Sequence, residues 1–146
     1  MARPILHPSD FSTASGPAFR KAIALAKGMR RPLLIANVVS PVTIVTGDMY
    51  MPANVWDQLE RAAEQAARRG LARLLKRARA AGIRASTLLL RGIAADRIVQ
   101  AARGRRAEMI VMGTHGRTGL KGMLLGSVAA RVVSHASCPV MTIRGK

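Results

Sequence analysis

The feature that most constrains this chain is a regular alternation between short apolar runs and longer segments with helical periodicity. The apolar runs occupy residues 5–6, 33–39, 83–90, 109–112 and 140–143. The segments between them, 16–27, 55–81, 94–103 and 127–136, repeat apolar side chains every three or four positions. Alternation of this kind favours parallel strands joined by crossover helices. The sequence therefore predicts an α/β fold, a five-stranded parallel sheet with helices on both faces.

Turn-forming residues mark the ends of several predicted helices. We expect Ser12 or Ser15 to cap the start of the first helix and Gly28 to end it. Gly82 is well placed to end the second helix. That long helix has one predicted apolar face, made of Trp56, Leu59, Ala63, Ala67, Gly70, Leu74, Ala78 and Ala81.

Length and composition limit the class of protein. The 146 residues predict a single domain, residues 1–146, and 49% hydrophobic with 21% charged residues is ordinary globular composition. The single cysteine, Cys138, excludes an internal disulfide framework and is expected to be a small buried side chain rather than a nucleophile. The uncharged stretch 32–47 is too short and too polar to span a bilayer. With no export segment visible, we expect a cytoplasmic protein without membrane contact.

The most informative motif is a glycine-rich segment between a predicted strand and a predicted helix. Five glycines lie within 14 residues, at positions 113, 116, 119, 122 and 126, and Ser127 follows them. Glycines allow backbone N–H groups to approach an anion, and a helix start attracts phosphate. Phosphate binding is therefore favoured over a merely flexible connection. A P-loop does not fit because Met123 follows Gly122, and the dinucleotide fingerprint does not fit because no acidic residue follows Glu108.

The spacing Gly113-x2-Gly116-x9-Gly126-Ser127 resembles the nucleotide-binding motif of the universal stress protein family, in its ATP-binding branch. Segments 5–12, 34–38, 107–113 and 138–140 resemble other parts of that family. Asn37 departs from the family pattern, which often has His there, and Glu108 departs where Asp is frequent. The resemblance implies a Rossmann-like, adenine nucleotide alpha hydrolase-like fold that binds ATP together with Mg²⁺.

The resemblance also implies which residues form the nucleotide site. They are Pro8, Asp10, Val38, Met112, Gly113, His115, Gly116, Arg117, Gly126, Ser127 and Val128. Val38 would act through its backbone on an adenine edge, and Ser127 could bond phosphate as well as cap its helix. Arg117 and Lys121 either pair with phosphate oxygens or are solvated charges.

Two candidate residues carry alternative interpretations. Asp10 can cap the following helix, or, on the resemblance, face the ribose or a phosphate-bound Mg²⁺. His115 is more readily a solvated loop residue than a general base, because no nucleophile or carboxylate partner lies near it in sequence.

Basic residues dominate the charge of the chain. Its 19 arginines and 5 lysines face 7 acids, for a net charge of +17, and they are spread through every predicted helix. Dispersed arginines are typical of solvated faces, although such a charge attracts nucleic acid or anionic lipid weakly. Phe11, Phe19, Tyr50 and Trp56 are the only aromatic side chains, so specific single-strand binding is not expected.

The leading interpretation is a small ATP-binding protein with a regulatory or protective role in stress, not an enzyme. The alternatives are a slow ATPase or nucleotidyl-transfer enzyme of the same build, and a basic nucleic-acid-associated protein. The closing apolar run, residues 139–143, is a candidate edge strand that would pair with a second copy as a homodimer, as the resemblance also implies. The competing view is that Arg144 and Lys146 protect a monomer's edge by charge.

Overall fold

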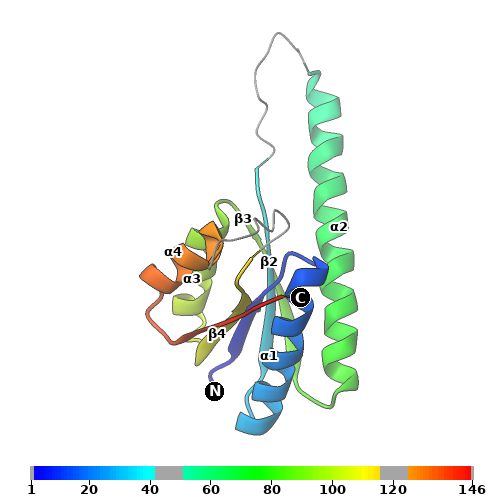
Figure 1. Ribbon diagram of the computed structural model, residues 1–146. Helices are drawn as coiled ribbons and strands as arrows, with labels where there is room; N and C mark the ends of the chain where they lie inside the picture. The colour runs from blue at the N-terminus through cyan, green and yellow to red at the C-terminus, as the bar shows by residue number, and fades with distance from the viewer. Residues whose placement is uncertain (1, 42–50, 116–124, 146) are drawn as a thin grey trace.

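The computed structural model describes residues 2–41, 51–115 and 125–145. Within them, one sheet contains β1 (Ile5–Pro8), β2 (Leu33–Val39), β3 (Ala85–Arg91), β4 (Met109–Gly113) and β5 (Val140–Ile143). The strand order is β3-β2-β1-β4-β5 and each neighbouring pair is parallel (Figure 1). The predicted five-stranded parallel sheet is thus confirmed.

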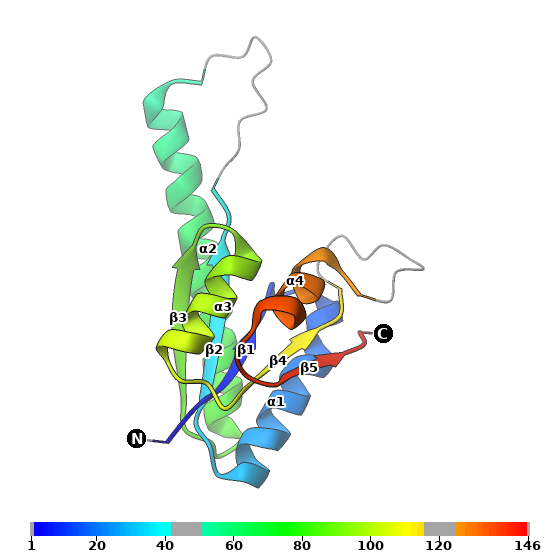
Figure 2. The same cartoon turned by 90° about the vertical axis from the view of Figure 1, so that its left-hand side faces the viewer.

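Helices cover both faces of this sheet, as Figure 2 shows. A single turn of 3-10 helix, η1 (Thr13–Ser15), leads into α1 (Gly16–Met29), which lies with α2 (Ala53–Ala80) on one face. The other face carries α3 (Ala94–Gly104) and α4 (Ser127–His135). Side chains of the central strands alternate between the two layers, so Leu33 packs towards α1 and α2 while Leu34 packs towards α3 and α4.

Several predicted boundaries were wrong. Gly28 does not end the first helix, which continues to Met29, and the left-handed residue that follows is Arg30, at φ 54°. Neither predicted serine caps α1 through its side chain, because Ser15 lies in the N-cap position but its hydroxyl donates to the carbonyl of Ser12. Gly82 does follow the end of α2, at φ 84°, which is the conformation that favours glycine there.

The long helix α2 is buried over only part of its length. Its 28 residues span about 42 Å, whereas the seven residues of β2 span about 23 Å. The first half of α2 therefore projects beyond the sheet (Figure 1). Its buried residues begin at Ala67, and Leu59, predicted on the same apolar face, is 42% exposed. The predicted face is core only in the second half of the helix.

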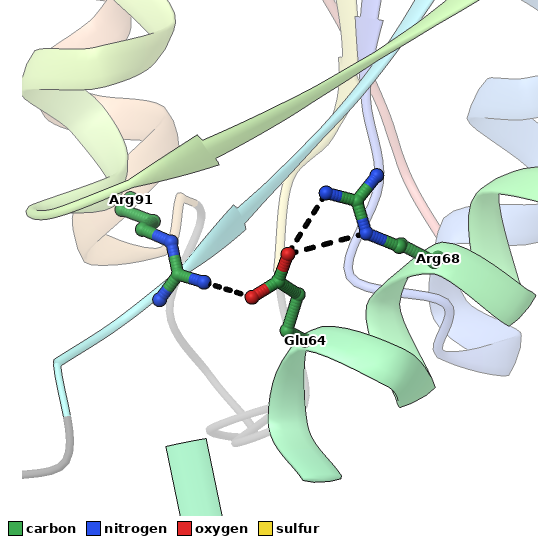
Figure 3. A network of polar contacts seen from close by, with 3 residues as sticks. All are labelled: Glu64, Arg68 and Arg91. Atoms are coloured by element: carbon green, nitrogen blue, oxygen red, sulfur yellow. Dashed lines mark hydrogen bonds and ion pairs between the residues drawn. The ribbon is translucent and has the colours of Figure 1, made fainter. Parts of the chain in front are cut away.

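Glu64 ties the projecting part of α2 back to the sheet. Its carboxylate accepts hydrogen bonds from Arg68, one turn along the helix, and from Arg91 at the end of β3 (Figure 3). Hydrogen bonding from Arg68, with the charge of Arg91 added, lowers the pKa of Glu64. Because these side chains are largely exposed, the contacts orient α2 rather than hold the fold together.

The interior of the sheet contains a neutral histidine. His7 in β1 is fully buried, and its Nδ1–H donates to the carbonyl of Val111 at 2.8 Å, while its ring lies 5.5 Å from that of Phe19. Its Nε2 has no hydrogen-bond partner among the described residues. Burial lowers the pKa of His7 from 6.5 to about 4, although the Val111 carbonyl and Asp10 oppose this shift.

This histidine predicts a loss of stability in mild acid. The unfolded chain protonates at His7 as pH falls through about 6.5, whereas the folded chain resists until about pH 4. The free energy of unfolding should therefore fall by about 2 kcal/mol between pH 7 and pH 5. Urea denaturation at several pH values measures it. His7→Leu should abolish most of the dependence and the exposed His135→Gln should retain it; equal slopes in all three proteins would contradict the assignment.

Candidate functional site

The order in which successive strands join the sheet reverses at its centre. β1 pairs with β2 on one side and with β4 on the other. The segment after β1 enters α1 on one face, and the segment after β4 leads to α4 on the opposite face. Parallel α/β sheets bind ligands at such a point, outside the carboxyl ends of the two strands. Most of the described candidate residues lie there.

The turn after β1 is organised by Asp10. Its Oδ1 accepts hydrogen bonds from the backbone N–H of Ser12 at 2.9 Å and from the Ser12 hydroxyl at 2.6 Å. Phe11 between them adopts φ 64°, and its N–H donates to the Ser9 hydroxyl. Asp10 therefore closes the turn that precedes η1, and it does not cap α1 as one interpretation expected.

Asn37 anchors this turn to the neighbouring strand. The buried side-chain amide of Asn37 donates to the carbonyl of Ser9 at 2.8 Å, and the N–H of Ser9 donates to the carbonyl of Ala36. Sequence reasoning assigned no role to Asn37. The available signal was a polar side chain inside an otherwise apolar run, which requires a hydrogen-bond partner when buried.

The backbone of Val38 is directed towards the end of β1. Successive residues of a parallel strand turn their backbone groups alternately to the two neighbours. The carbonyl of Ala36 accepts from Ser9 on the β1 side, and that of Val39 accepts from Gly92 on the β3 side. The N–H and C=O of Val38 consequently face the β1 side, and β1 ends at Pro8, opposite Ala36.

The end of β4 and the start of α4 meet through Thr114. Its N–H donates to the carbonyl of Ile143 at 3.0 Å, and its own carbonyl accepts the N–H of Gly126 at 2.6 Å. The buried Thr114 hydroxyl lies 2.9 Å from Nδ1 of His115. These contacts fix where α4 begins relative to the sheet, next to the turn after β4.

Gly126 is required by this close approach. A Cβ at Gly126 would lie 2.9 Å from the Thr114 carbonyl oxygen, whereas one at Gly113 would make only ordinary contacts, from 3.4 Å. Gly126 is the N-cap residue of α4, and no side chain among the described residues caps the helix. The first N–H groups of α4, from the exposed Ser127 and Val128 onwards, and the positive end of its dipole therefore suit an anion.

The remaining candidate residues differ in position. Met112 is buried and its side chain packs in the layer with α3 and α4, so it supports the site from within the core. Pro8 is likewise buried at the end of β1. Gly116, Arg117 and Lys121 lie outside the described residues.

A contact between Phe11 and Gly70 supports the β1 turn from the side of α2. A Cβ at Gly70 would lie 2.6 Å from the Phe11 ring. Sequence reasoning placed Gly70 on the apolar face of the helix without identifying its partner. A glycine inside a strongly helical segment was the available signal, because glycine is unfavourable there unless packing requires it.

No helix in the described part of the chain is long and apolar enough to cross a membrane. Over the same residues, no three His, Cys, Asp or Glu side chains are grouped so as to hold a metal ion. A Mg²⁺ ion brought in by a nucleotide needs fewer protein ligands, because it commonly uses one or two carboxylates together with phosphate oxygens and water. Asp10 meets that requirement by its chemistry.

The fold is that of a doubly wound α/β protein, with the β1 turn and the start of α4 beside the point where the strand order reverses. A family profile described as the universal stress protein family matches residues 1–144. The chain belongs to that family, and the proposed resemblance is confirmed. Universal stress protein MJ0531 of Methanocaldococcus jannaschii is 35% identical over 141 residues, which cover 96% of this chain and 81% of that protein.

Solved structures agree in fold. Hypothetical protein MJ0577, also from M. jannaschii, aligns with a TM-score of 0.86 and 25% identity over 100% of this chain and 98% of its own. A universal stress protein from Archaeoglobus fulgidus, solved in complex with dAMP, aligns with a TM-score of 0.69 and 25% identity over 97% of this chain and 98% of its own.

The Phe11–Gly70 contact yields a prediction with an internal control. Gly28→Ala in α1 should stabilise the protein by about 0.5–1 kcal/mol, because a Cβ there meets nothing within 4 Å and glycine is costly in a helix. Gly70→Ala should destabilise it despite the same gain in helix propensity, because the ring of Phe11 must move. Thermal unfolding of both variants measures this, and a Gly70→Ala protein as stable as Gly28→Ala would show that the contact is dispensable.

Proposed function

We propose that this protein binds ATP at the carboxyl edge of the sheet, between the β1 turn and the start of α4. The observation that carries the proposal is the start of α4, where Gly126 lies against the Thr114 carbonyl and the helix has no described side-chain cap. Phosphate oxygens fit the first N–H groups of that helix. The dAMP complex of the A. fulgidus relative supports an adenine nucleotide as the ligand class.

The other candidate residues take complementary roles in this proposal. The N–H and C=O of Val38 are directed towards the end of β1, where they can read the edge of an adenine ring. Asp10 is held in place by Ser12 and is suited to the ribose or to a phosphate-bound Mg²⁺. Thr114 and His115 line the turn after β4. Gly116 and Arg117, which the resemblance assigns to the site, lie outside the described residues.

Binding rather than turnover is the proposed activity. The sequence offers no P-loop lysine, because Met123 follows Gly122. Asp10 is the sole carboxylate of the β1 turn, and its Oδ1 accepts two hydrogen bonds from Ser12. Membership of the universal stress protein family and the absence of a P-loop lysine support a regulatory or protective role in a cytoplasmic stress response, with slow hydrolysis at most.

A charge placed at the start of α4 tests the site. Ser127→Asp should weaken ATP binding by at least about tenfold, because its carboxylate repels phosphate, while helix-dipole stabilisation by about 0.3–1 kcal/mol keeps the protein folded. Calorimetric titration with ATP and Mg²⁺ measures the affinity. Ser127→Ala is the matched control and should bind within a few fold of the wild type. Unchanged ATP affinity in Ser127→Asp would contradict the site.

We further propose that two copies pair through β5. Strand order places β5 at one edge of the sheet, and all four of its residues are partly exposed. An unpaired apolar edge favours antiparallel pairing with its symmetry mate. The alternative is a monomer in which the positive charge of Arg144, next to β5, prevents this edge strand from pairing with another copy.

Thr142→Pro should convert the dimer to a monomer. The carbonyls of Pro139 and Ile143 accept from β4, so by alternation the N–H of Thr142 faces the free edge of β5, and proline has no N–H to donate there. Light scattering at micromolar concentration gives the mass. Thr87→Pro on the opposite edge strand, β3, is the control and should leave the mass unchanged. A wild-type mass of one chain would refute the dimer, and a dimer that survives Thr142→Pro must use another face.

A further inference from the structure

The fold gathers arginines that are scattered along the sequence. Each helix runs opposite to the strands, so all four helices end at the amino edge of the sheet, opposite the proposed nucleotide site (Figure 1). The loops at this edge contain six arginines, Arg3, Arg30, Arg31, Arg84, Arg105 and Arg106. The last turns of α1, α2 and α3 add Lys27, Arg79 and Arg103.

Acidic residues are distributed in the opposite way. Among the described residues, Glu108 is the only carboxylate in these loops, and it lies 3.6 Å from Arg3 and 3.7 Å from Arg31. The other described acids lie in the β1 turn, in the first half of α2 and in the first turn of α3. The single carboxylate of Glu108 cannot neutralise all of these arginines and lysines, so the amino edge carries a concentrated positive charge.

Two of these arginines occupy positions that favour glycine. Arg30 follows α1 at φ 54° and Arg106 follows α3 at φ 51°, and both side chains are exposed. A glycine takes this left-handed conformation at lower conformational cost. Attraction to the helix dipole explains basic residues in the last turns, but it does not require arginine at these two strained loop positions.

The same edge contains an arginine-lined hollow of about 340 Å³. Arg3, Arg103 and Arg106 line it together with Ser137 and the partly buried Cys138. Arg3 is fixed across the α3–β4 loop, because its Nε donates to the Arg106 carbonyl at 3.2 Å. Three arginines and a serine around one concave surface suit a phosphate group, although the Arg3 guanidinium also lies 3.6 Å from the Glu108 carboxylate.

We propose that the amino edge is a docking surface for the phosphodiester backbone of double-stranded nucleic acid, with a phosphate in the arginine-lined hollow. The described aromatic residues Phe11, Phe19 and Trp56 lie in other parts of the fold, so this edge has no platform for stacking unpaired bases. Its described residues also do not form the large exposed apolar surface that inserts into a membrane. The nearest exposed large hydrophobic residues are Met29 and Val133. Backbone contacts of this kind do not read sequence.

The test compares two variants of the full chain that each lower the net charge from +17 to +13. The edge variant combines Arg30→Gly, Arg84→Gln, Arg105→Gln and Arg106→Gly, of which the two glycines relieve left-handed strain and protect folding. The control variant combines Arg20→Gln, Lys21→Gln, Arg61→Gln and Arg69→Gln, all at exposed helix positions. The probe is a fluorescent mixed-sequence DNA duplex, titrated between about 50 and 200 mM salt.

The edge variant should bind the duplex at least about tenfold more weakly, with a salt slope lower by about two to four, and the control variant should lose less than about threefold. Equal losses in both variants, or no duplex binding by the wild type at the lowest salt, would overturn the proposal. Binding to phosphatidylserine vesicles without binding to the duplex would overturn it in favour of a membrane surface.

Cys138 provides a second readout at the hollow itself. It is the only cysteine of the chain, and burial raises the pKa of its thiol, so its alkylation is slow but specific. Saturating duplex should slow that reaction further, and an unchanged rate would exclude the hollow from the binding surface. Mg·ATP should leave the affinity for the duplex unchanged, because the two surfaces lie at opposite ends of the strands. The ATP titration of Ser127→Asp therefore tests the nucleotide site independently of the duplex titration.

Discussion

The short central strand β1 is the constraint on which the rest of the structure depends. It has four residues, all buried, and it pairs with β2 and β4 at its two edges. Because β1 lies between β2 and β4, the strand order reverses there, and the Asp10 turn comes near the end of β4. His7 lies inside this strand, and the bond from its Nδ1–H to Val111 links the two strands on either side of the reversal.

Because all helices run opposite to the strands, the two edges of the sheet differ electrically. Helix starts and most described carboxylates lie at the carboxyl edge, where the start of α4 offers free N–H groups. Helix ends lie at the amino edge, where the partial negative charge of each helix is exceeded by the arginines of the loops. A single topological rule thus underlies both proposed anion-binding surfaces, which differ in chemistry because one consists of backbone amides and the other of guanidinium groups.

Much of the fold could be predicted because apolar periodicity is a local signal. The strands at 33–39 and 140–143 and the start of α4 at Ser127 agree with the structure. Contacts between distant residues could not be predicted: Gly70 against Phe11, and Asn37 beneath Ser9, depend on how α2 and β2 approach the β1 turn. The arginines were interpreted as dispersed because they are dispersed along the sequence, and only the strand order shows that six of them share one edge. Gly126 was identified from its spacing in the sequence, but the reason for a glycine there, its close contact with the Thr114 carbonyl, is visible only in the structure.

The projection of α2 has a consequence for local unfolding. Beyond Glu64 towards Ala53, the helix contains no buried residue, so its stability there depends on hydrogen bonds within the helix rather than on packing. An unsupported helical segment of about 12 residues is marginal in water. Backbone amide hydrogens in this segment should therefore exchange with solvent through opening events far smaller than global unfolding, while those after Ala67 exchange only when the core opens. The helix is continuous, but its two halves are expected to unfold separately, and the boundary lies near the Glu64 contacts with Arg68 and Arg91.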